Sequence, residues 1–91
     1  MASNAYAALA ALDVAANLPE DAAAHYEQAL LYATSDAKRG EYQARLALLY
    51  HELGNDEAAQ TAAEVSLDLL VEGDQLRTEV EAVLAEMEGG S

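Results

Sequence analysis

The chain has 91 residues, of which 53% are hydrophobic, and it carries no cysteine and a formal net charge of −13 at neutral pH. A chain of this length fits a single small domain, 1–91, and the lack of cysteine excludes a disulfide framework, a thiolate zinc site and a cysteine nucleophile. The acidic charge disfavours nucleic acid and anionic membrane surfaces as partners, because both carry phosphates that it repels.

The composition predicts an all-α fold. Much of the apolar content is alanine, which has the highest helix propensity, and there is one proline and five glycines to interrupt helices. Strand-like alternation of apolar and polar residues is absent. We expect five helices, which run in chain order from about Asn4 to Ala16, from Pro19 to Ala33, from after Ser35 to Leu53, from after Asn55 to about Glu72, and from Asp74 to Glu88.

Local signals at helix ends support these boundaries. Ser3 or Asn4 is expected to cap the first helix, and Asn55 the fourth. Pro19 suits the first turn of the second helix, where its missing N–H costs nothing. Gly54 is a natural stop for the third helix because glycine readily adopts the left-handed conformation that follows many helices.

The chain contains an internal repeat. A shift of 37 residues pairs Leu9 with Leu46, Leu12 with Leu49, Ala22 with Ala59 and Leu30 with Leu67. A further shift of 34 pairs Leu46 with Val80 and Leu49 with Val83. A repeat of this size is typical of stacked supersecondary units. It predicts two helix hairpins, 3–33 and 35–72, then a capping helix, 74–88, with 89–91 read as a linker scar.

The segment from Gly40 to Leu70 resembles a tetratricopeptide repeat. The residues that carry the resemblance are Leu46, Ala47, Tyr50, Gly54, Asn55, Ala59, Ser66 and Leu67. The first copy matches less closely, since Asn17 stands where the turn glycine belongs and Asp13 where a large aromatic belongs. The resemblance implies a short solenoid of antiparallel hairpins with an irregular first hairpin.

Members of that family mostly bind an extended or helical segment along a groove that the first helix of each hairpin lines. Carried onto this sequence, the groove candidates are Ala11, Val14, Glu41, Ala44, Arg45, Leu48, His51 and Glu52. This small, apolar and mildly acidic lining implies a basic or apolar segment of a protein or peptide as partner, with no cofactor. The basic and asparagine clamp of some members is absent, because alanine and leucine occupy its positions.

The remaining polar residues do not indicate catalysis. His51 lies beside Glu52 with Arg45 two turns earlier, which could form a groove contact or ordinary surface. We expect His25 to pair with Asp21 on the helix surface. Two histidines on different hairpins form no metal motif, and no phosphate loop or nucleophile elbow is present. The sequence therefore predicts a non-enzymatic protein.

Location and alternative functions follow from composition. No apolar run approaches the roughly 20 residues that a membrane span needs, and the N-terminus lacks a secretory signal, so we expect a cytoplasmic protein without a membrane partner.

Two alternatives stay open beside a binding module: an engineered helical scaffold without an evolved ligand, and an acidic decoy of a nucleic-acid-binding protein. Self-association is a further expectation, because a two-hairpin stack exposes apolar surface at its ends.

Overall fold

The computed structural model describes residues 2–89, and within them all regular secondary structure is α-helical. The helices are α1 (Ala2–Ala15), α2 (Pro19–Tyr32), α3 (Asp36–Glu52), α4 (Asp56–Leu69) and α5 (Gln75–Gly89). The predicted all-α fold with five helices is confirmed. Of the expected linker scar, Gly89 is the last residue of α5, and Gly90 and Ser91 lie outside the described residues.

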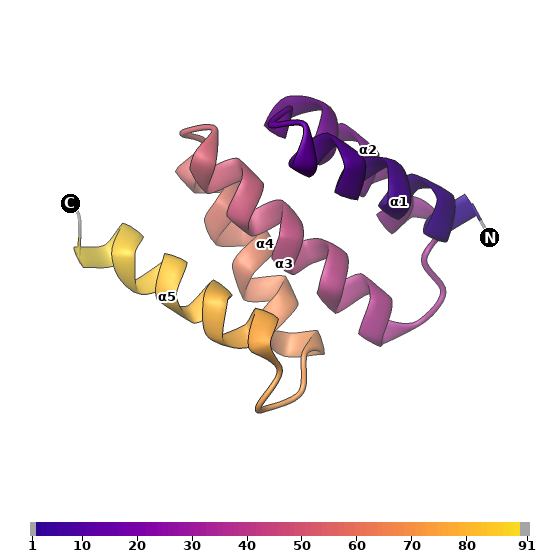
Figure 1. The fold of residues 1–91 in the computed structure, drawn as a ribbon. Helices are drawn as coiled ribbons and strands as arrows, with labels where there is room; N and C mark the ends of the chain where they lie inside the picture. Colours follow the sequence, from indigo (N-terminus) through magenta and orange to yellow (C-terminus); the bar gives the residue numbers. More distant parts are fainter. Residues whose placement is uncertain (1, 90–91) are drawn as a thin grey trace.

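The helices form two hairpins and one additional helix (Figure 1). Helices α1 and α2 pack against each other, as do α3 and α4, and the two hairpins meet mainly through α2 and α3. Helix α5 contacts both α3 and α4 and lies on the side of the second hairpin that faces away from the first (Figure 1). The second hairpin is therefore covered on two sides, whereas the first hairpin is covered on one.

Both hairpins turn in the same way. Helix α3 ends 37 residues after the end of α1, and α4 begins 37 residues after the start of α2. Helices α2 and α4 have the same length of 14 residues. Asn17 and Gly54 both adopt positive φ, at 61° and 84°. The N–H groups of Asn17 and Leu18 bond back to the carbonyls of Val14 and Asp13, and the second hairpin repeats this pattern after Tyr50. Asn17 thus takes the conformation of the glycine, because asparagine tolerates the left-handed region, so this turn does not show the irregularity that was expected of the first hairpin.

The predicted cap of the fourth helix is correct, the predicted cap of the first is wrong, and the third helix has a side-chain cap that was not predicted. The side chains of Ser35 and Asn55 accept the N–H groups of Lys38 and Ala58 at the starts of α3 and α4. Helix α1, however, begins at Ala2, so that Ser3 lies inside it. The hydroxyl of Ser3 is buried and donates a 3.2 Å hydrogen bond to the Tyr42 hydroxyl, so this side chain links α1 to α3 and does not cap α1.

The core is built from small residues at the helix crossings and a few larger side chains. Fully buried alanines are Ala10, Ala22, Ala29, Ala44, Ala47, Ala59 and Ala63. Tyr42 and Leu46 of α3 fill the space between the hairpins, and the Tyr42 ring lies 6.0 Å from that of Tyr26. Gly40 lies where α3 crosses the end of α4, and a Cβ atom added there would lie 3.0 Å from Cβ of Leu69. Small size at these positions sets how closely the helices approach.

Arg77 attaches α5 to the end of α4. Its Nη1 atom donates to the carbonyl oxygens of Leu67 at 2.7 Å and Leu70 at 3.1 Å, and its Nε lies 3.7 Å from a carboxylate oxygen of Glu81. A cation at this position also compensates the negative end of the α4 dipole. Helix α4 ends at Leu69, three residues before the expected end near Glu72, because Leu70 becomes extended and buries its side chain.

Candidate functional site

A hollow between α1 and α3 is the candidate site, and we call it the α1–α3 hollow. Its volume is about 320 Å³. Its lining residues are Ala11, Val14, Tyr26, Arg45, Leu48, Leu49 and Glu52. Tyr26 and Leu49 are buried and form the floor, and the exposed Arg45 and Glu52 place charges of opposite sign at its border. The hollow is thus an apolar depression with a polar rim, which is the usual chemistry of a site that anchors an apolar group.

Five of the eight residues that the resemblance implied meet in this hollow, namely Ala11, Val14, Arg45, Leu48 and Glu52. The structure does not bring the other three there. Ala44 is fully buried in the core, Glu41 lies 3.6 Å from Nζ of Lys38, and His51 faces α4 and α5. The spacing placed these three on the groove helix, but neighbouring helices cover or engage their side chains.

Tyr26 and Leu49 are part of the hollow, although the sequence pattern assigned them only to packing. Both belong to the apolar stripes of their helices, and such stripes do not reveal that one edge of a buried residue faces a depression. Burial raises the pKa of the Tyr26 hydroxyl, and the nearby Arg45 opposes that rise. The hydroxyl therefore stays protonated at neutral pH, so the floor of the hollow is uncharged.

The hollow continues toward the first turn of the chain. A smaller depression of about 70 Å³ shares Val14, Leu49 and Glu52 with it and adds Asn17, Leu18 and Pro19. Because Asn17 holds the left-handed conformation there, the turn brings Leu18 and Pro19 beside the end of the hollow. The two depressions form one apolar track along the α1 side of α3.

A second hollow, of about 550 Å³, lies between α3 and α4, and we call it the α3–α4 hollow. Its lining residues are Gln43, Tyr50, Asn55, Glu57, Ala58, Thr61, Ala62 and Val65. It is wider but more polar than the α1–α3 hollow. The Tyr50 hydroxyl donates to the Glu27 carboxylate, and burial together with this bond raises the pKa of Tyr50. This bond joins the two hairpins, which gives Tyr50 a structural role.

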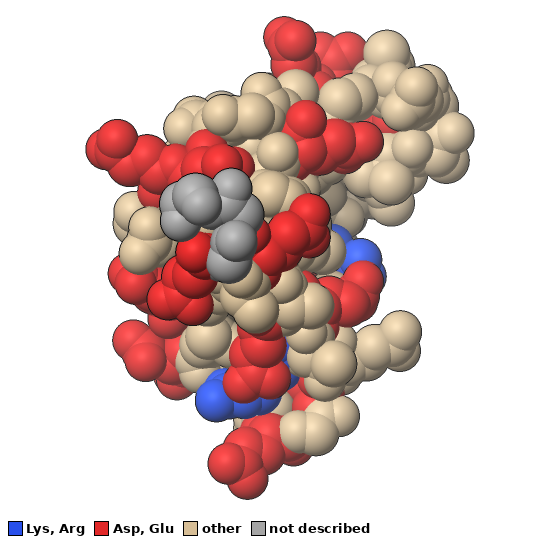
Figure 2. Space-filling model, turned by 90° about the vertical axis from the view of Figure 1, so that its left-hand side faces the viewer, with Lys and Arg blue, Asp and Glu red and all other residues tan. Residues whose placement is uncertain are grey.

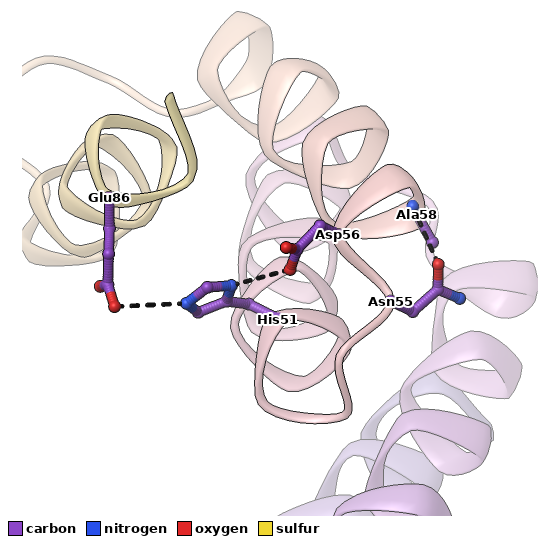
Figure 3. A network of polar contacts seen from close by, with 5 residues as sticks. All are labelled: His51, Asn55, Asp56, Ala58 and Glu86. Carbon is purple, nitrogen blue, oxygen red and sulfur yellow. Dashed lines mark hydrogen bonds and ion pairs between the residues drawn. The ribbon is translucent and has the colours of Figure 1, made fainter. Parts of the chain in front are cut away.

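His51 connects three helices near the turn between α3 and α4 (Figure 3). Its Nδ1 atom lies 3.0 Å from Oδ1 of Asp56, the first residue of α4, and its Nε2 atom lies 3.6 Å from Oε1 of Glu86 on α5. The hydrogen bond to Asp56 raises the pKa of His51, partial burial opposes this, and Glu86 adds to the rise. The imidazolium form is thus favoured by carboxylates from two helices.

This arrangement predicts a pH-dependent attachment of α5. The pKa of His51 in the folded chain is above its usual value of 6.5. The contacts of the imidazolium therefore stabilise the folded chain fully below pH 6.5, and this stabilisation is lost as the pH rises through the pKa of the folded state. We expect Asp56→Asn to lower the pKa of His51 in an NMR titration, and Glu86→Gln to lower it less. An unchanged His51 titration in Asp56→Asn would contradict the assignment.

His25 pairs with Asp13 on α1, and the expected pairing with Asp21 is wrong. Nδ1 of His25 contacts Oδ2 of Asp13, and the ring of Tyr6 stacks 6.4 Å from His25 and 5.9 Å from Tyr32. These contacts hold α1 on α2. Asp13 stands where the resemblance expects an aromatic residue, and in this position its carboxylate contacts His25 of the same hairpin.

Within residues 2–89, no group of three or more histidine, aspartate or glutamate side chains is arranged to hold a metal ion. No helix of this part of the chain is both long and apolar enough to cross a lipid bilayer. No family model, curated protein or solved structure matches the chain.

Proposed function

We propose that the chain is a non-catalytic, protein- or peptide-binding module of stacked, tetratricopeptide-like hairpins. The observation that supports this most directly is the position of the α1–α3 hollow. It lies between the first helices of the two hairpins, which is where the resemblance places a binding groove, and five of the expected lining residues contribute to it. The shared turns of the two hairpins and the equal lengths of α2 and α4 further support a repeat architecture.

The partner that best fits the hollow is a segment with an apolar side chain next to a basic one. The volume of about 320 Å³ suits one or two side chains, and the floor of Tyr26 and Leu49 offers no charge to pair with. The rim of the hollow includes Glu52 beside Arg45, and eleven of the seventeen acidic residues of the chain lie from Glu52 onward. Such a field speeds the approach of a basic segment, whereas the apolar contact provides most of the affinity.

The acidic residues are spread over the surface on the α5 side (Figure 2). In this view the red side chains are separated by tan ones, and few blue ones are present. A distributed negative field attracts basic segments in general and does not by itself select one sequence. Selectivity in this proposal therefore comes from the shape and apolar lining of the α1–α3 hollow.

A random peptide library tests the proposal. We expect peptides selected on the immobilised protein to share an apolar residue beside Lys or Arg, and to bind Val14→Asp at least tenfold more weakly than the original chain in fluorescence anisotropy. A carboxylate at position 14 would stand in the apolar contact without a partner, which is costly. NMR shifts of the methyl groups of Ala11, Val14 and Leu48 should respond to the peptide.

Val65→Asp is the matched control, because Val65 is also a partly exposed valine but lines the α3–α4 hollow. It should leave peptide affinity within about twofold. Equal losses in the two variants would contradict a specific hollow. Peptides rich only in basic residues, with steep salt dependence and no response to Val14→Asp, would favour the acidic decoy instead.

A further inference from the structure

Helix α1 has an outward face that is apolar and uncovered. The residues of this face are Ala5, Ala8, Leu9, Leu12 and Ala15, followed by Ala16 in the turn after the helix, and all of them are exposed. Leu12 is 66% exposed and Leu9 44% exposed. The only charged residue of α1 is Asp13, which points the other way and pairs with His25. A chain of net charge −13 thus has one helix face without any charge.

The internal repeat shows what this face is built to contact. Leu9, Leu46 and Val80 occupy equivalent positions in the three copies, yet Leu46 is 2% exposed and Val80 is fully buried. In the same way Leu12 corresponds to Leu49, which is 7% exposed and faces the first hairpin in the α1–α3 hollow. In the second and third copies this face packs on the preceding hairpin. In the first copy the corresponding residues, Leu9 and Leu12, are exposed instead.

The other end of the stack is closed to such a contact. Helix α5 covers the far side of the second hairpin, and its own exposed side chains include Glu79, Glu81 and Glu86. Stacking of one copy on the α5 end of the next would place an apolar face against carboxylates. A head-to-tail filament is therefore disfavoured, and the α1 faces of two copies are the surfaces that can meet.

Charge separation also favours contact through α1. Residues 1–33 contain four of the seventeen acidic residues, and the remaining thirteen belong to the rest of the chain. Because α5 and the second hairpin lie away from the outer side of α1, a pair formed through α1 keeps the most acidic parts of the two copies apart (Figure 1). Contact through α5 would instead bring exposed carboxylates of the two copies together, which is unfavourable.

We propose that the outward face of α1 is a self-association surface on which a second copy of this chain docks, to form a two-fold symmetric dimer. The two leucines of this face lie between alanines on both sides, so two antiparallel α1 helices can pack with Leu12 of one copy over Ala5 of the other. Ala8 and Leu9 then lie near the two-fold axis. The α1–α3 hollow stays open, because it lies on another side of α1, and the proposal is independent of the proposed peptide binding.

Sedimentation equilibrium tests the association. The original chain should approach twice its mass of 9.6 kDa as concentration rises, and more so at high salt, which screens repulsion between two acidic copies. Leu12→Glu should weaken the association roughly 100-fold or more, because each copy then places an unpaired carboxylate against the apolar α1 face of the other. Val71→Glu is the control, since Val71 is 71% exposed in the loop before α5 and should leave the association unchanged.

A single introduced cysteine locates the contact, because the chain has no other cysteine. Ala8→Cys should form a disulfide-linked dimer under mild oxidation, and Ala82→Cys, at an exposed alanine on α5, should form much less. Circular dichroism confirms that each variant remains helical. A constant mass of one chain at all concentrations, or equal cross-linking of the two cysteine variants, would overturn the proposal.

Discussion

Tyr42→Ala is expected to lower the free energy of unfolding by about 3–5 kcal/mol, the usual cost of removing a buried aromatic ring. Tyr42 is almost completely buried in α3, where it contacts the ring of Tyr26 and accepts a hydrogen bond from Ser3 of α1. The substitution therefore leaves a cavity at the junction of three helices. Urea denaturation followed by circular dichroism measures the loss.

The polar part of this contact can be separated from the packing. Tyr42→Phe keeps the ring and removes the hydroxyl, so it should cost about 1 kcal/mol, as should Ser3→Ala. Because both variants break the same hydrogen bond, the double variant should cost little more than either single variant. Fully additive losses would show that Ser3 and Tyr42 do not interact.

Gly40→Leu is expected to lower the free energy of unfolding by about 1–3 kcal/mol, because α3 and α4 must separate to admit the side chain. A Cβ atom at this position already meets Leu69 at 3.0 Å and Leu70 at 3.1 Å. Leucine has a higher helix propensity than glycine by nearly 1 kcal/mol, so the loss occurs despite a favourable local effect. Thermal unfolding measures the result.

Two further variants separate crowding from helix propensity. Ala37→Leu lies at an exposed position one turn earlier in α3 and should change stability by less than about 0.5 kcal/mol. Gly40→Ala should fall between the two, since its gain in propensity offsets a small shift of Leu69 and Leu70. An increase in stability for Gly40→Leu would mean that the two helices are not in close contact at this crossing.

Local chemistry made the helices predictable. Pro19 begins α2, Ser35 and Asn55 cap α3 and α4, and Asn17 takes the conformation of the glycine that it replaces. Each of these features depends on a residue and its near neighbours in the sequence. The end of α4 was less predictable, because Leu70 leaves the helix in order to enter the core.

The contacts between helices could not be predicted from spacing. The bonds from Tyr50 to Glu27 and from Arg77 to the end of α4 connect residues of different helices, and their partners depend on how the helices pack. For the same reason the sequence placed His51 with the groove residues, whereas the structure turns it toward Asp56 and Glu86. The resemblance indicated which helices line the candidate groove. Which of their side chains reach the α1–α3 hollow depends on the packing of the neighbouring helices.

The equal spacing of the two hairpins has a consequence for how such a chain can grow. Helices α2 and α4 are the same length and follow turns of the same geometry. The segment from α3 to α4 is therefore a structural unit that can be duplicated. Duplicating that segment in front of α5 would add one layer without changing either end of the molecule. The number of hairpins is thus a quantity that gene duplication can alter, while the closing helix needs to be encoded only once.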